Sequence, residues 1–300
     1  AIVTFAGMSV TGFFMLFNSG VFEKNVTIDV YFCPPYDCEM IMNHMLLKSK
    51  RVDCALYRLS LNSTINILKE KPHRLVADEL STMGEHFLNV KLRKDKKLMH
   101  NKFCVLDDKI VMTGSFNPTY RNKDDFNNLI IVESKHLAKL YNEEFEEMWK
   151  GTFGGGKTVR PNKILYPRGS IEVLFCPEDG CEKRLIDEIN KARFNVYFMV
   201  FTFTHPDIAK ALVNAKERGV VVSGIIEKSS KNKWTKYEFL RVNGVDVKWD
   251  SYPNLLHTKI FIIDNSTIAV GSFNPTISAD RYNDENLLII NDETIATYFV

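Results

Sequence analysis

Hydrophobic positions along the chain follow the same order of periods twice. In the second half, a helical period over 182–192 precedes an apolar strand over 195–204, a second helix over 206–218 and a strand over 220–226. An apolar run broken by a short polar turn then predicts a β-hairpin. The first half repeats this plan in shortened form. We therefore expect an α/β protein of two similar domains, with the hairpin strands in the middle of each sheet.

The two predicted hairpins carry the same polar residues, 157 positions apart. Each reads H-x-K-x4-D-x6-G-S-x-N, once from His100 and once from His257. Residues two apart in a strand share a face, and a two-residue turn brings both strands' polar residues together. The expected pairs are Lys102 with Ser115, His100 with Asn117, Lys259 with Ser272, and His257 with Asn274. Imidazole, ammonium, hydroxyl and amide groups on one face predict a site for a phosphate group.

These two motifs resemble the signature of the phospholipase D superfamily, and both copies match without a gap. The segment 283–286, Asn-Asp-Glu-Asn, resembles the N-x-E-N strand that follows the signature in the small nuclease branch. The resemblance covers most of residues 28–300. It implies two phospholipase D-like α-β-α domains related by pseudo-two-fold symmetry, with one active site at their interface. Because one chain holds both half-sites, activity does not require a dimer, and the oligomeric state stays open.

The resemblance also implies a role for each motif residue. One of His100 and His257 would attack phosphorus while the other protonates the leaving oxygen, in an order that stays open. The non-bridging oxygens would be held by Lys102, Lys259, Asn117 and Asn274, with hydrogen bonds from Ser115 and Ser272. Asp107 and Asp264 lie at the turns, where a structural role is expected. No metal or other cofactor is implied, because the patch is cationic and offers no carboxylate cluster.

One position breaks the symmetry between the two copies. Alignment of the strands that follow the motifs places Asn127 where the second copy has Glu285. A carboxylate that accepts from the far ring nitrogen of a histidine stabilises the imidazolium. We expect Glu285 to support His257, and His100 to face an amide unless Asp124 or Asp125 reaches it.

Composition does not decide the substrate, but two local runs favour nucleic acid. The formal net charge is only +2 over 300 residues, so attraction for a polyanion must be local. Basic residues cluster at 91–97 and, mixed with aromatic residues, at 228–237, which suits phosphates and stacked bases. The prediction is a metal-independent endonuclease acting on DNA or RNA. A membrane-associated phospholipase or cardiolipin-type hydrolase, and a non-catalytic nucleic-acid-binding protein, are the alternatives.

The chain divides into an apolar start and two domains. Residues 1–22 carry no charge, which favours a membrane anchor over a buried first helix. Domain 1 is expected at 26–150, a glycine-rich linker at 151–170 and domain 2 at 171–300. The second copy ends before the long helix expected after its last strand, so we expect the natural protein to continue. The anchor suggests a membrane-anchored protein, and local disulfides at the repeated cysteine pairs would be compatible with an extracytoplasmic domain behind it.

The cysteines form a repeated pattern of their own. Cys33 with Cys38 and Cys176 with Cys181 follow the first strand of each half. Two local disulfides are the preferred interpretation, with a four-cysteine zinc site or free thiols as alternatives. Cys54 and Cys104 lie in apolar strands and are expected to be core residues.

Overall fold

The computed structural model describes residues 20–80, 88–93 and 97–300. The strands of the first half are β1 (Val21–Phe22), β2 (Thr27–Cys33), β3 (Val52–Leu59), β4 (His73–Leu80), β5 (Val90–Leu92), β6 (Lys102–Leu106), β7 (Ile110–Gly114) and β8 (Asn127–Glu133). Its helices are α2 (Cys38–Lys48), α3 (Asn62–Lys69) and α5 (Lys135–Lys150).

The second half repeats these elements at greater length. Its strands are β9 (Lys163–Tyr166), β10 (Gly169–Cys176), β11 (Asn195–Val200), β12 (Val221–Ile226), β13 (Asp246–Trp249), β14 (Lys259–Ile263), β15 (Thr267–Gly271) and β16 (Glu285–Asn291). Its helices are α6 (Cys181–Lys191), α7 (Pro206–Glu217), α8 (Tyr237–Val242), α9 (Ile277–Arg281) and α10 (Glu293–Ala296), with a short 3-10 helix at Lys228–Ser230. The first two helices lie within one residue of their predicted bounds.

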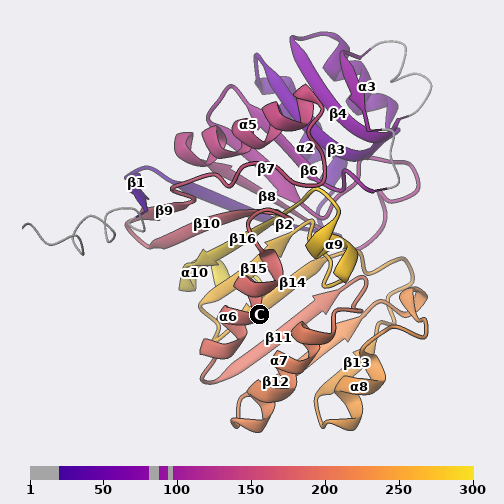
Figure 1. Ribbon diagram of the computed structural model, residues 1–300. Helices are drawn as coiled ribbons and strands as arrows, with labels where there is room; N and C mark the ends of the chain where they lie inside the picture. The colour runs from indigo at the N-terminus through magenta and orange to yellow at the C-terminus, as the bar shows by residue number, and fades with distance from the viewer. Residues whose placement is uncertain (1–19, 81–87, 94–96) are drawn as a thin grey trace, which may run out of the picture.

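Each half of the chain builds one mixed sheet, and β1 of the first half joins the sheet of the second half (Figure 1). The strand order is β2-β8-β7-β6-β3-β4-β5 in the first sheet and β1-β9-β10-β16-β15-β14-β11-β12-β13 in the second. The hairpins β6–β7 and β14–β15 are interior in both sheets, which confirms the predicted α/β plan of two similar domains.

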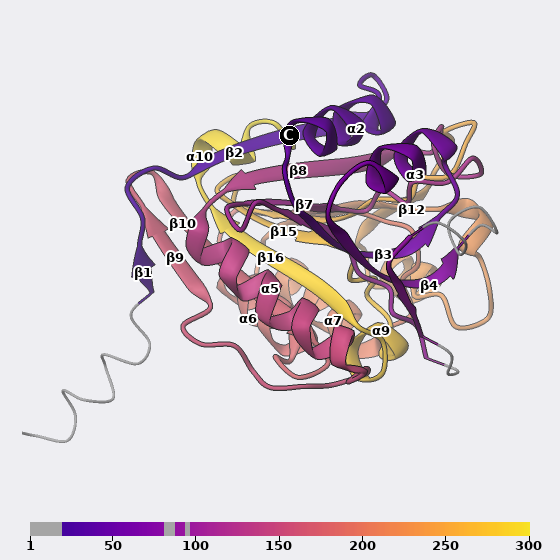
Figure 2. The same ribbon diagram turned by 90° about the horizontal axis from the view of Figure 1, so that it is seen from above.

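Three apolar layers hold the sheets and helices together. The inner faces of the two sheets share one core with α5 and α10. The outer face of the first sheet packs against α2 and α3, and that of the second against α6, α7 and α8. Helix α5 lies beside β16 of the other domain (Figure 2), where the Tyr141 hydroxyl donates a 3.1 Å hydrogen bond to Asn286 Oδ1. The domain interface is thus a packed core, which fixes one half-site against the other.

Both hairpin turns are one residue longer than predicted. The closing pairs are Leu106 with Ile110 and Ile263 with Thr267. Asp107 and Asp264 therefore lie in the loops, both with φ of 51°. Their carboxylates accept backbone N–H groups at the start of the neighbouring strands, such as Arg51 N at 2.8 Å and Phe194 N at 2.7 Å. These hydrogen bonds favour the left-handed backbone conformation of the two aspartates in the loops. The longer turn shifts the expected pairing of Lys102 with Ser115 by one residue.

All six cysteines form disulfides. The bonds Cys33–Cys38 and Cys176–Cys181 confirm the preferred prediction for the repeated pairs. The prediction for Cys54 and Cys104 was incomplete, because these buried residues form a third disulfide. They are direct partners in the β3–β6 register, with Cα atoms 4.0 Å apart. Pairing of two strands 50 residues apart in sequence creates this bond.

The ends of the predicted domains need two adjustments. Residues 1–19 of the predicted anchor lie outside the described residues, whereas Val21–Phe22 form β1, parallel to β9. The first strand that the second half adds to this sheet, β9, begins at Lys163, inside the predicted linker 151–170. Among the described residues, no helix combines the length and apolar character needed to cross a membrane.

Candidate active site

The two motif histidines meet where the domains cross. His100 precedes β6 and is 7% exposed, and His257 lies two residues before β14 and is 6% exposed. His100 N–H donates to the Asp284 carbonyl, and His257 N–H donates to the Phe126 carbonyl, both at 2.9 Å. The backbone of the other domain therefore holds each histidine. The carbonyl that accepts the bond belongs to the residue just before Glu285 or just before Asn127.

Glu285 pairs with His100, the histidine of the other half. Its Oε2 lies 2.8 Å from His100 Nδ1 and also accepts the Ser272 hydroxyl at 2.6 Å. The prediction that Glu285 supports His257 is wrong. The backbone bridge across the interface points the start of β16 at the opposite histidine, so each half supplies the partner for the other.

His257 faces an amide instead. Its Nδ1 lies 2.9 Å from Asn127 Oδ1, which also accepts the Ser115 hydroxyl at 3.0 Å. Asn127 Nδ2 donates to the Asp125 carbonyl at 3.1 Å, so the amide orientation leaves Oδ1 as the acceptor. His257 Nδ1 is consequently the donor, and Nε2 is available for chemistry. The Asp125 carboxylate accepts hydrogen bonds from Asn122 Nδ2 and the Leu255 N–H. It therefore does not replace Asn127 as the partner of the histidine.

Burial and like charges dominate the electrostatics of the site. Lys102 and Lys259 are 3% and 2% exposed, and each ammonium donates to the carbonyl of its own histidine. Burial lowers the pKa of Lys102 to about 7 and that of Lys259 well below its usual range. Burial and these ammonium groups lower the pKa of both histidines. Burial raises the pKa of Glu285 to about 7. These effects favour binding of an anion, whose negative charge would restore the protonated forms of the lysines and histidines.

The motif serines position other groups. Ser115 Oγ accepts the Asn128 N–H, and Ser272 Oγ accepts the Asn286 N–H, both at 3.0 Å. Because each hydroxyl also donates to Asn127 or Glu285, these serines orient the histidine partners. Asn117 Oδ1 and Asn274 Oδ1 are buried without a hydrogen-bond partner among the described residues. These two amides retain unused hydrogen-bonding capacity.

Two aromatic rings and an arginine complete the site and were missed in the sequence. The Tyr57 ring lies 4.8 Å from the His100 ring, and the Phe201 ring 5.1 Å from that of His257, between ring centroids. They hold equivalent positions, since Tyr57 N–H and Phe201 N–H bond the residue after each histidine. Arg58 adds a positive charge that lowers the pKa of His100 and Lys102. Aligning the strands before the hairpins would have found this pair of rings.

The two basic runs differ in the fold. In the first run, Arg93 is buried in an ion pair with Asp284, while 94–96 lie outside the described residues. In the second run, Trp234 is 65% exposed and the Lys233 ammonium lies 4.9 Å from its ring centroid. The first run also has a described basic and aromatic contact, because the Lys97 ammonium lies 3.6 Å from the ring centroid of Tyr282, which is 42% exposed.

Comparisons with known proteins agree with this architecture. A family model described as cardiolipin synthase, PLD-like domain, matches residues 25–149 and 185–300. Phospholipase D of Rickettsia conorii is 30% identical over 205 residues, which cover 68% of this chain and 94% of the relative. Mitochondrial cardiolipin hydrolase of Xenopus tropicalis is 30% identical over 133 residues, 44% of this chain and 63% of the relative.

A solved structure extends the comparison to the whole fold. Phosphatidylserine synthase of Haemophilus influenzae superposes with a TM-score of 0.67 at 13% identity, covering 91% of this chain and 84% of that chain. The shared feature at this identity is the fold. With both halves matched by the family model and both motifs joined in one site, the chain belongs to the phospholipase D superfamily and is a phosphodiester hydrolase.

Proposed function

We propose that His100 is the nucleophile and His257 the general acid of a two-step phosphodiester hydrolysis. An imidazole that attacks phosphorus becomes positively charged, and the Glu285 carboxylate at His100 Nδ1 would stabilise that charge. The neutral amide at His257 offers less stabilisation, so the His257 imidazolium gives up its proton more readily. The contrast between the two Nδ1 partners carries this assignment.

The steps balance with these two side chains and one water. His100 Nε2 forms a bond to phosphorus as the bond to the leaving oxygen breaks, and His257 Nε2 gives that oxygen its proton. Neutral His257 then takes a proton from water, whose oxygen attacks phosphorus and releases His100. A bound phosphodiester anion raises the pKa of His257 and favours the imidazolium that the first step requires.

The lysines and asparagines would hold the phosphate oxygens. Lys102 and Lys259 gain a partner of opposite charge when the diester binds, which offsets the cost of burying two ammonium groups. The Nδ2 groups of Asn117 and Asn274 would donate the remaining hydrogen bonds to the phosphate oxygens. The same groups serve any phosphodiester, so the substrate must be chosen outside the phosphate pocket.

We propose nucleic acid as the substrate, on the strength of the basic and aromatic loop between β12 and α8. The loop with Lys233 and Trp234 follows Glu227, whose carboxylate accepts the Leu256 N–H at 2.7 Å, one residue before His257. An exposed indole beside lysines suits a base stacked next to a phosphate. A phospholipid is the second candidate, favoured by the relatives named phospholipase D and cardiolipin hydrolase.

Parallel assays in EDTA at 25 °C distinguish these substrates. Labelled single-stranded DNA, double-stranded DNA, RNA and cardiolipin-containing vesicles would be compared with wild-type protein and Trp234→Ala. We expect nucleic-acid cleavage, reduced about tenfold in Trp234→Ala, since a stacked base contributes roughly 1–3 kcal/mol. The matched control is Phe194→Ala, which removes an aromatic ring that is 70% exposed. Phe194 directly precedes β11, at the end of the strand away from Phe201 and the active site. Lipid headgroup release without nucleic-acid cleavage would reverse the assignment.

We further propose that the protein works in an oxidising compartment, attached to a membrane by the uncharged segment that precedes β1. Three disulfides favour an extracytoplasmic location, and the uncharged segment has the length of a membrane span. Thiol labelling of protein taken from its natural cells should find no reactive cysteine. Carbonate extraction should leave the full chain in the membrane and release a chain without 1–19.

A further inference from the structure

A buried histidine lies outside the active site, directly before α7. His205, the residue before α7, is 1% exposed, and neither of its ring nitrogens finds a partner among the described residues. Burying an imidazole without hydrogen bonds is costly, so an unused pair of nitrogens calls for a ligand.

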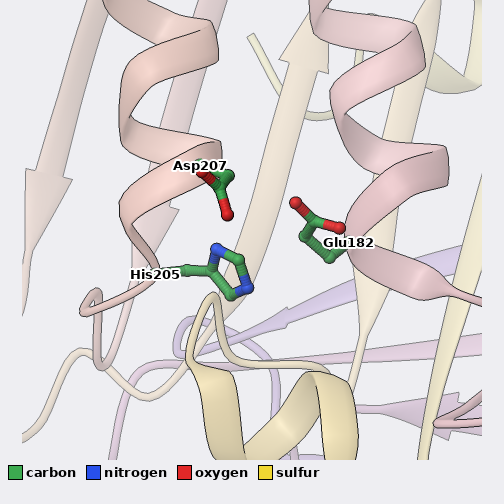
Figure 3. A group of neighbouring side chains, drawn as sticks. All are labelled: Glu182, His205 and Asp207. Carbon is green, nitrogen blue, oxygen red and sulfur yellow. The ribbon is translucent and has the colours of Figure 1, made fainter.

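Carboxylates from three helices surround this ring. Figure 3 shows Glu182 of α6 and Asp207 of α7 pointing toward His205, with one ligand atom of each residue within 4.8 Å of the others. Asp280 of α9 has its Oδ2 3.9 Å from His205 Nε2. Arg281 Nε lies 3.7 Å from Asp280, so three carboxylates face one guanidinium and negative charge is in excess. Asp207 is exposed, which gives an ion access from solvent.

The first domain provides an internal comparison. The N–H groups of Ser60 and Leu61 bond the Pro118 carbonyl, as those of Thr204 and His205 bond the Pro275 carbonyl, so Leu61 is the counterpart of His205. By the same alignment, Ser63 corresponds to Asp207, Glu39 to Glu182 and Lys123 to Asp280. Ser63 donates a 2.5 Å hydrogen bond to Glu39, which satisfies that site without an ion. All four positions of the second copy therefore hold metal-binding residue types, whereas the first copy keeps only Glu39.

We propose that Glu182, His205, Asp207 and Asp280 bind one divalent transition-metal ion, with zinc as the best match. A single imidazole with carboxylate oxygens suits zinc, whereas calcium and magnesium prefer sites made of oxygen ligands alone. The ion would join α6, α7 and α9, which belong to separate parts of the second domain.

The location gives this ion a structural task next to the catalytic hairpin. The His205 N–H bonds the carbonyl of Pro275, the residue after Asn274, and Asp280 Oδ1 accepts the Glu182 N–H at 3.3 Å. An ion held by these residues would fix the loop that carries Asn274. The catalytic groups themselves are not among its ligands, so the ion stabilises the fold and takes no part in the chemical steps.

The test measures bound metal and melting temperature on the full chain after tag removal. Wild-type protein, His205→Leu, Asp207→Ser and Glu39→Gln would be stripped with chelator and dialysed separately against zinc, manganese, calcium and magnesium. His205→Leu and Asp207→Ser install the residues that the first domain already uses, so folding should survive. Glu39→Gln is the matched control at the first-domain counterpart of Glu182.

We expect one zinc ion per wild-type chain and a rise in melting temperature of about 5 °C at saturating zinc. His205→Leu and Asp207→Ser should lose both effects, and Glu39→Gln should keep both. Zinc that stays in both site variants but is lost in His257→Ala would belong to the catalytic histidines and overturn the proposal. Absence of binding to the wild-type protein would overturn it as well.

Discussion

Glu285 Oε2 and His100 Nδ1 lie 2.8 Å apart, although the two residues belong to different halves of the chain. The equivalent contact in the other direction joins His257 to the amide of Asn127 at 2.9 Å. The two histidines are thus nearly symmetric in position and different in chemistry. This difference underlies the separate roles that we propose for them and makes those roles measurable.

Substitution of each histidine should have different effects on substrates with poor and good leaving groups. On a natural diester, His100→Ala and His257→Ala should each lower kcat by about 10³-fold or more. On a p-nitrophenyl diester, whose leaving group needs no proton, His257→Ala should retain release of nitrophenol while His100→Ala remains inactive. The measurement is the nitrophenol burst, with acid-quenched protein analysed for phosphohistidine. The reverse pattern would exchange the two roles.

Asn127→Glu should give His257 the carboxylate partner that His100 already has. A carboxylate stabilises the imidazolium, so the pKa of His257 should rise, and the decline of kcat at high pH should move up by about one unit. Asn127→Gln is the neutral control and should leave the profile in place. An unchanged alkaline limb in Asn127→Glu would mean that another group supplies the proton.

Removal of a catalytic ammonium should stabilise the protein while it abolishes activity. Burial lowers the folded-state pKa of Lys102 to about 7 from 10.5 in the unfolded chain, so the folded state binds the proton less well. The free-energy cost of burying the protonated Lys102 side chain is fully present below pH 7 and disappears as the pH rises toward 10.5. Lys102→Met should therefore raise the free energy of unfolding by a few kcal/mol at pH 6, and by about half of that or less at pH 9. Urea titrations at both pH values test this, and an equal gain at both would contradict it.

The Cys54–Cys104 bond should stabilise the fold more than the local disulfides do. It closes a loop with a sequence separation of 50, against 5 for Cys33–Cys38. Loop-closure entropy predicts a loss of about 4 kcal/mol on replacing Cys54 and Cys104 with alanine, and about 2 kcal/mol for the Cys33 and Cys38 pair. Urea unfolding without reductant would measure both. A larger loss for the local pair would show that the entropy of the unfolded chain is not the main contribution.

Local spacing in the sequence determined the parts of the site that lie close together in the chain. The histidine and lysine of each motif share a face because a strand has a period of two residues, and the hairpins follow from apolar runs around a polar turn. The repeated cysteine pairs are five residues apart, a separation that a single turn can close. The turn length was the local error, because the conformation of Asp107 depends on backbone groups of another strand.

The tertiary structure decided every relationship that joins distant segments. Contact of Glu285 with His100, the Cys54–Cys104 bond and the carboxylates around His205 each require strand register or helix packing across long stretches of chain. The sequence by itself could name the two histidines and their symmetric motifs. It could not assign Glu285 to either histidine, because aligned positions in a repeat do not reveal that the domains exchange partners across their interface.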